Sequence, residues 1–168
     1  YPSGREVADK NLFGVSLLLH RSAHLEFAKN NPQLSCKRFL RSAKLSLQMG
    51  NPVSSALNVS NAASALALFL QGNEQGQEKL AELRRLERKT GRLFAEKADL
   101  VNPLTRAGYH NRLGVAYSAL ARNPDSGEIT SVVRSASLLA NAGSHFYQGL
   151  RILKQDQDSS REKSRLRS

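Results

Sequence analysis

The stretch "RFLRSAKLSLQMGNP", residues 38–52, decides how this chain folds. Its first part carries apolar side chains three or four residues apart, which are Phe39, Leu40, Ala43 and Leu47. Apolar residues at this spacing lie on one face of a helix, whereas a proline pushes the residue before it out of the α region. The stretch therefore predicts an amphipathic helix that ends at a corner formed by Asn51-Pro52.

The same kind of break divides the rest of the chain. Asn-Pro pairs recur at residues 31–32, 102–103 and 123–124, and the glycine-rich "GNEQG" at 72–76 adds another corner. Between these breaks lie six segments of helical length and period, at about residues 5–29, 33–49, 53–71, 77–100, 104–122 and 128–154. The third contains "AASALALFL", residues 62–70, which indicates a helix that is buried on most sides.

These segments define the expected fold class. No sustained alternation of apolar and polar residues, typical of a strand, occurs between turn residues. Connections of two to five residues force consecutive helices to lie antiparallel. We therefore predict an all-α fold of six helices that form three antiparallel hairpins, arranged as a short α-solenoid or a closed bundle.

A short phrase recurs in the first and third expected hairpins. Arg-Ser-Ala-x-Leu occurs at residues 41–45 and again at 134–138, and each copy follows a helix that contains Gly-Val, "FGVSL" at 13–17 and "LGVAY" at 113–117. Small side chains let two helix backbones approach closely. We expect Gly14 to pack near Ala43 and Gly114 near Ala136, with Leu45 and Leu138 filling the seams between the helices.

One of these copies resembles a known family. The stretch "NRLGVAYSAL", residues 111–120, is similar to the first helix of a tetratricopeptide repeat, in which Leu-Gly-x-Ala-Tyr forms the core. The resemblance covers about residues 107–140 and implies a concave surface that binds a peptide or a helix. We expect three polar side chains to face a groove and contact a partner: Asn111, Tyr117 and Asn141.

Composition and charge indicate the size of the domain and the kind of partner. The chain has 168 residues, 40% of them hydrophobic, no Trp, a formal charge of +11 and a pI of about 10.3. This length suits one helical domain, which we place at residues 1–155. Residues 156–168 hold a single apolar side chain, Leu166, and are expected to form a disordered basic tail. The charge favours an acidic protein, a nucleic acid or an anionic membrane surface as partner.

Two groups of cations are spaced to share helix faces. The first is Lys37, Arg41 and Lys44, and the second is Arg84, Arg85, Arg88, Lys89 and Arg92. No Asp or Glu occurs between Phe27 and Asn73, so the first group is expected to lack a local carboxylate. A solvated helix face explains such groups as well as a binding surface does, and the sequence leaves both interpretations open.

Residues that would indicate catalysis or a metal site are few. His20 and His24 have a spacing that can hold zinc, but Arg21 stands where a carboxylate would be needed. Cys36 lies near cations yet has no accompanying catalytic group, and a single helical cysteine is more often a core residue. We expect no enzyme activity, no metal and no cofactor.

The first functional prediction is a non-enzymatic α-helical module that binds an acidic peptide or helix of a protein partner. The alternative is a protein that binds RNA or DNA through phosphates, although no zinc finger or RNP-like strand is present. No membrane span is expected, and the oligomeric state stays open. The single cysteine and the lack of a signal peptide favour an intracellular location, for a chain that begins with Tyr1 and can be a fragment.

Overall fold

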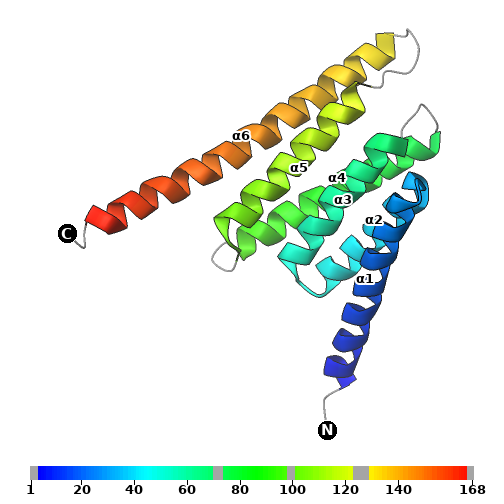
Figure 1. Ribbon diagram of the computed structural model, residues 1–168, viewed down its shortest axis with the longest axis horizontal. Coiled ribbons are helices and arrows are strands. Elements are labelled where there is room, and N and C mark those ends of the chain that lie inside the picture. Colours follow the sequence, from blue (N-terminus) through cyan, green and yellow to red (C-terminus); the bar gives the residue numbers. More distant parts are fainter. Residues whose placement is uncertain (1–3, 70–73, 98–100, 123–128, 166–168) are drawn as a thin grey trace.

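The computed structural model describes residues 4–69, 74–97, 101–122 and 129–165, and these residues form helices and short connections without a strand (Figure 1). The helices are α1 (Gly4–Ala28), α2 (Pro32–Gln48), α3 (Pro52–Phe69), α4 (Glu74–Glu96), α5 (Pro103–Ala121) and α6 (Ile129–Arg165). The all-α prediction is therefore confirmed, and the observed starts differ from the expected ones by one to three residues.

Consecutive helices pack against each other in pairs, as hairpins require: α1 with α2, α3 with α4, and α5 with α6. Helix α3 lies at the centre, because it also contacts α2 and α5. Its small and branched side chains explain how it fits there: Val59, Ala62, Ala63 and Leu66 are all 0% exposed. The expectation that residues 62–70 belong to a helix buried on most sides is confirmed for the described residues.

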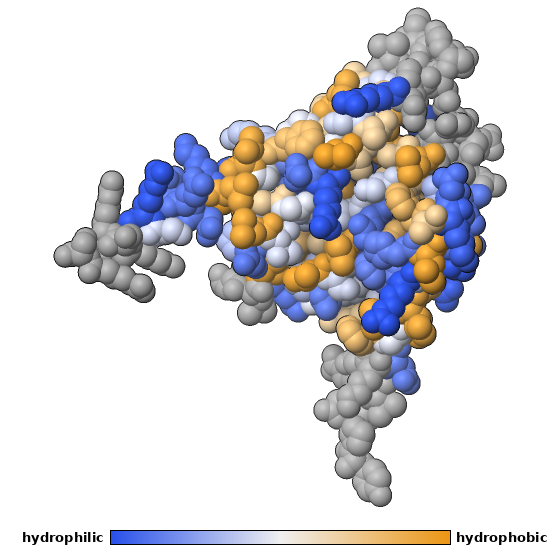
Figure 2. All heavy atoms as spheres, in the orientation of Figure 1, coloured by the Kyte–Doolittle hydropathy of each residue, from blue (hydrophilic) through white to orange (hydrophobic). Residues whose placement is uncertain are grey.

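Helix α6 is longer than its sequence pattern predicts. It runs to Arg165, beyond the expected end at residue 154, and extends away from the other helices (Figure 1). On the face drawn in Figure 2, apolar side chains gather where this extension leaves the body, whereas the extension itself is hydrophilic. The domain boundary at residue 155 stays a prediction, but the chain remains helical past it. Among the described helices, none combines the length and the apolar character that crossing a membrane requires.

The corners before α2 and α3 have the same backbone conformation and the same capping contact. Asn30 and Gly50 have φ angles of 59° and 62°, in the left-handed region that ends many helices. The next residue is an asparagine whose side-chain oxygen accepts a hydrogen bond from the backbone of the new helix, at 3.3 Å from Asn31 to Leu34 and 3.0 Å from Asn51 to Ser54. A proline then begins the helix, where its missing N–H costs nothing.

The predicted corners at Asn31, Asn51 and Asn102 are thus confirmed. Asn102 caps α5 in the same way, accepting from the backbone N–H of Leu104 at 2.8 Å. The fourth Asn-Pro pair, residues 123–124, lies outside the described residues, as do the first residues of "GNEQG".

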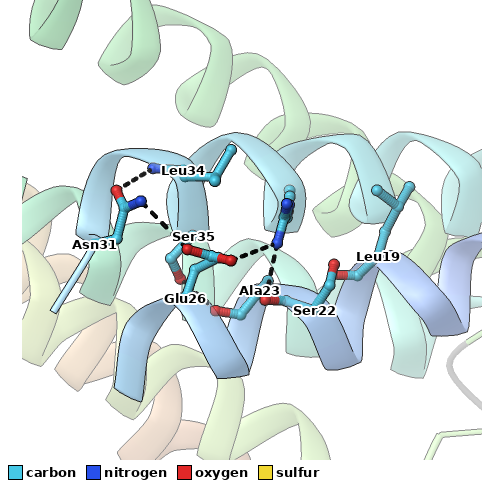
Figure 3. A network of polar contacts seen from close by, with 8 residues as sticks. Leu19, Ser22, Ala23, Glu26, Asn31, Leu34 and Ser35 are labelled. Atoms are coloured by element: carbon cyan, nitrogen blue, oxygen red, sulfur yellow. Dashed lines mark hydrogen bonds and ion pairs between the residues drawn. The ribbon is translucent and has the colours of Figure 1, made fainter. Parts of the chain in front are cut away.

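Polar contacts fix the angle between α1 and α2 at their shared corner (Figure 3). The Asn31 side chain donates to Glu26 at 3.2 Å, and Arg38 donates to the same carboxylate at 3.0 Å. Ser35 donates to the backbone carbonyl of Ala23 at 2.9 Å. Arg38 therefore has a carboxylate partner although no acidic residue occurs between Phe27 and Asn73, because Glu26 lies just before that stretch.

The seam between α1 and α2 is built from serines and not from the predicted glycine. Ser16 and Ser42 are 3% and 0% exposed, and their hydroxyls lie 3.0 Å apart. Ser46 donates to the carbonyl of Ser42 at 2.9 Å. By contrast, a Cβ atom at Gly14 would meet nothing within 4 Å, so Gly14 does not mark a close approach.

The seam between α5 and α6 also differs from the prediction. A Cβ atom at Gly114 would lie 2.7 Å from the ring of Phe146, and Ala136 is exposed. Gly114 therefore makes room for Phe146 and not for Ala136. Ala43 and Leu138 are 0% and 2% exposed, whereas Leu45, which was expected to fill the first seam, is only half-buried.

Candidate functional site: a basic groove between α2 and α4

A cavity of about 530 Å³ lies between α2 and α4, and cations of both predicted groups line it. Lys44 comes from α2, and Arg85, Lys89 and Arg92 come from α4. Leucines lie between the cations, namely Leu47, Leu86 and Leu93. We call this cavity, with these four cations and three leucines, the basic groove.

Helical spacing explains why α4 presents its cations to the groove. Leu80, Leu83 and Leu86 point into the core, with exposures of 4%, 0% and 2%. Arg85, Lys89 and Arg92 follow one another at intervals of four and three residues, so they share a face of the same helix. All three are exposed, and no ion pair is found for them within the described part of the chain.

Lys44 differs from the other groove cations because it has a carboxylate partner. Its Nζ lies 2.8 Å from Glu82, which also contacts Lys79 at 3.4 Å. Burial opposes the charge on Glu82, but the hydrogen bond and charge of Lys44, together with those of Lys79, outweigh burial and lower the pKa of this carboxyl. The prediction that Lys44 lacks a carboxylate is therefore wrong, and a second acid, Glu96, also lines the groove.

The remaining predicted site residues are scattered. Lys37 and Arg41 are exposed on α2 but do not line the basic groove. Arg88 and Asn141 line a different cavity, of about 220 Å³, on the other side of α4. Asn111 is exposed in a groove between α5 and α6. Arg84 is half-buried, and its Nε atom has no hydrogen-bond partner among the described residues.

Tyr117 does not face a groove, which corrects the prediction for this residue. It is 1% exposed, its hydroxyl donates to Glu87, and its ring stacks on His145 with 5.6 Å between centroids. His145 donates through Nε2 to the other oxygen of Glu87 at 3.0 Å. Burial opposes the charge on Glu87, but the hydrogen bonds from His145 and Tyr117 lower its pKa overall.

This polar network continues to His110, whose Nδ1 lies 3.0 Å from Nδ1 of His145. Burial, and then the neighbouring His145, lower the pKa of His110 to about 4. Tyr109 is 4% exposed and its hydroxyl has no hydrogen-bond partner among the described residues. Glu87, His110 and His145 lie far apart in the chain and carry no local motif, so the sequence does not predict this network.

The candidates for metal binding and catalysis gain no support. His20 hydrogen-bonds Asn58 at 2.9 Å, and His24 contacts the ring of Phe39. Within the described residues, no three His, Cys, Asp or Glu side chains are grouped as a metal site would require. Cys36 is 1% exposed, and burial raises the pKa of its thiol to about 12, so it is not poised to react.

Comparisons with family models, curated proteins and solved structures found no match to this chain. The tetratricopeptide resemblance of residues 107–140 therefore stays a prediction. Its core positions are nevertheless buried as that pattern would need: Leu113, Ala116 and Tyr117 are at most 2% exposed.

Proposed function

We propose that this protein is a non-enzymatic helical module whose basic groove binds an acidic segment of a partner protein. The observation that carries the proposal is the meeting of Lys44 from α2 with Arg85, Lys89 and Arg92 from α4 around one cavity. A chain with a formal charge of +11 attracts acidic partners over long distances, and a groove lined by four cations and one carboxylate, Glu96, concentrates that attraction.

The leucines in the groove favour a protein segment over a nucleic acid. Leu47 and Leu93 are half-buried and offer apolar contacts between the cations, which suit aliphatic or aromatic side chains of a peptide, whereas Leu86 is 2% exposed and belongs to the core. Single-stranded nucleic acids are usually held by aromatic side chains on which bases stack, and no aromatic residue lines this groove.

The arginines further suggest how the acidic side chains are held. A guanidinium group donates two parallel hydrogen bonds to one carboxylate, and hydrogen bonds to charged groups contribute roughly 1.5–3 kcal/mol each. Arg85 and Arg92 are exposed and have no ion pair within the described part of the chain, so they remain available for such contacts.

The proposal is tested with a short labelled peptide rich in glutamate and leucine and interrupted by prolines, so that it cannot form a helix, measured by fluorescence anisotropy. The double variant Arg85→Glu/Lys89→Glu should bind it at least tenfold more weakly. The control Arg21→Glu/Lys29→Glu makes the same change in net charge. Arg21 is exposed on α1 and Lys29 is exposed just after the end of α1, so this control should change the affinity by less than about twofold.

The nucleic-acid alternative is tested in the same experiment. A short single-stranded RNA is added at rising salt concentrations, where binding through phosphates weakens steeply. If RNA binds more tightly than the peptide and the Arg85→Glu/Lys89→Glu variant loses RNA binding, the groove is a phosphate-binding surface and the peptide proposal is wrong.

A further inference from the structure

A second groove lies at the other end of the molecule, between α5 and α6. It has a volume of about 500 Å³, and its walls carry Leu104 and Asn111 from α5 and Phe146, Leu150 and Leu153 from α6. Leu104 and Leu150 are 65% and 67% exposed, so most of their apolar surface has no cover. We call this the apolar groove. Figure 2 shows apolar side chains gathered where the extension of α6 leaves the body.

Glycines at the base of the apolar groove make it hollow. A Cβ atom at Gly149 would lie 3.4 Å from the carbonyl oxygen of Ala107, so α5 and α6 approach closely there. Gly108 lines the groove, and a Cβ atom at this position would meet nothing within 4 Å. Leu104 on α5, the large apolar residues on α6 and the small residues between them leave a trough between the two helices.

The walls of the apolar groove repeat with the spacing of helical ridges. On α5, Leu104, Gly108 and Asn111 follow at intervals of four and three residues, and on α6, Phe146, Leu150 and Leu153 do the same. A third helix lies well in such a trough, because its side chains fit between ridges that have the same spacing. The shape therefore fits a helix.

The charge around the apolar groove indicates which kind of helix. Neither α5 nor the part of α6 from Ile129 to Lys154 contains an Asp or a Glu. Three exposed cations lie along this hairpin, which are Arg112, Arg151 and Lys154. We propose that the apolar groove binds an amphipathic helix of a partner protein, with an apolar stripe in the trough and acidic residues on the flanks of that stripe.

A second copy of this chain is a poorer occupant. Its helix α1 also has an uncovered apolar face, where Phe13, Leu18 and Leu25 are 54%, 69% and 61% exposed. Arg21 is exposed among these residues, three after Leu18 and four before Leu25. Docking α1 of one copy into the apolar groove of another would place this cation against the part of the hairpin, up to Lys154, that has no carboxylate, since Asp156, Asp158 and Glu162 follow only on the extension of α6.

A membrane surface also fits less well. A bilayer inserts apolar side chains that project outward, whereas the apolar groove is concave and a flat surface would reach only its rims. The inference does not depend on the basic groove, since the two sites share no lining residue.

The experiment uses two designed peptides of equal length, both with leucines at helical spacing. One has glutamates on the flanks and the other has lysines. Fluorescence anisotropy should show that the glutamate peptide binds the full chain at least tenfold more tightly than the lysine peptide. Leu104→Glu/Leu150→Glu should weaken its binding at least tenfold, and the milder Leu104→Ala/Leu150→Ala should weaken it several-fold.

Matched controls separate this site from the others. Leu18→Glu makes the same kind of change on the exposed face of α1 and should change the affinity for the glutamate peptide by less than about twofold. Arg85→Glu/Lys89→Glu in the basic groove should also change this affinity by less than about twofold. If only the basic-groove variant loses the glutamate peptide, the peptide binds there and the apolar groove is not its site. Circular dichroism and urea unfolding confirm that the variants fold, since both mutated leucines are about two-thirds exposed.

Three further outcomes would overturn the proposal. Equal affinity for the two peptides would show that the acidic flanks of the helix do not contribute to its recognition. A dimer in sedimentation equilibrium that Leu104→Glu/Leu150→Glu dissociates assigns the groove to a second copy. Binding to vesicles of mixed neutral and anionic phospholipid that the same variant abolishes, without peptide binding, assigns it to a membrane.

Discussion

The hydroxyl of Tyr117 on α5 donates a hydrogen bond to the carboxylate of Glu87 on α4. This contact joins two helices that the sequence pattern does not place together. The same carboxylate accepts from His145 on α6, so Glu87 connects three helices through one charged group. Buried charges persist only where they are paired and hydrogen-bonded, and the network therefore fixes how α4 packs against the last hairpin.

Replacing Tyr117 with phenylalanine should destabilise the fold. The change removes one hydrogen bond to a half-buried carboxylate and leaves the ring in place, so we expect a loss of about 1–3 kcal/mol in the free energy of unfolding. Urea denaturation measures this loss. Tyr147→Phe is the matched control, since Tyr147 is 67% exposed, and should change stability by less than about 0.5 kcal/mol. Equal effects of the two variants would contradict the buried network.

Stability should fall as the pH is lowered from about 6.5 to about 4, in part because of His110. Burial and the nearby His145 lower the pKa of His110 to about 4, with Arg106 acting in the same direction and Glu87 against it. The unfolded chain takes up this proton near pH 6.5, so between these values it binds more protons than the folded chain. Below pH 4 both states are protonated, and His110 causes no further loss.

The variant His110→Asn tests this dependence. Urea unfolding of wild type and variant is compared at pH 7.5 and pH 5, and the wild type should lose more stability than the variant between the two. His24, whose pKa burial and His20 also lower, contributes in the same direction in both proteins and cancels in the comparison. An identical loss in both proteins would show that His110 is not held neutral.

The helices could be predicted because their signals are local. Asn31, Asn51 and Asn102 each stand one residue before a proline, and the capping contact that each makes involves only the next few residues. Such contacts depend on the nearby chain alone. The sequence pattern does not predict where α6 ends. The last turns of this helix show no apolar stripe, and only helical propensity favours their helical conformation.

The basic groove could be predicted only in part. The spacing of Arg85, Lys89 and Arg92 places them on one helix face, and this follows from the sequence. That Lys44 joins them, and that Glu82 pairs with it, depends on how α2 and α4 cross beside α3. Glu87 and His145 are 58 residues apart, so no helical period relates them. The resemblance places Tyr117 in the core of the repeat, but it gives no information about the contact of Tyr117 with Glu87 on α4.

The thiol of Cys36 should be unreactive while the chain is folded. It is 1% exposed, and burial raises its pKa to about 12, so the reactive thiolate is scarce at neutral pH. Labelling with Ellman's reagent at pH 8 should be slow in buffer and fast in urea. In a Cys36→Ser background, the exposed Ser137→Cys supplies a thiol that reacts in buffer. Fast labelling of native Cys36 would mean that the core around this thiol opens in the folded chain.

Substituting alanine for Gly114 should have the opposite effect from the same change at Gly14. A Cβ atom at Gly114 would lie 2.7 Å from the Phe146 ring, so overpacking should outweigh the gain in helix propensity and destabilise by about 1 kcal/mol. At Gly14 a Cβ atom meets nothing within 4 Å, and alanine should stabilise α1 by about 0.5–1 kcal/mol. Removing the ring with Phe146→Ala should turn the effect of Gly114→Ala into a stabilising one, because the two changes are coupled through direct contact. Urea denaturation of both single variants and the double variant measures this coupling, and additive free energies would show that Phe146 does not lie over Gly114.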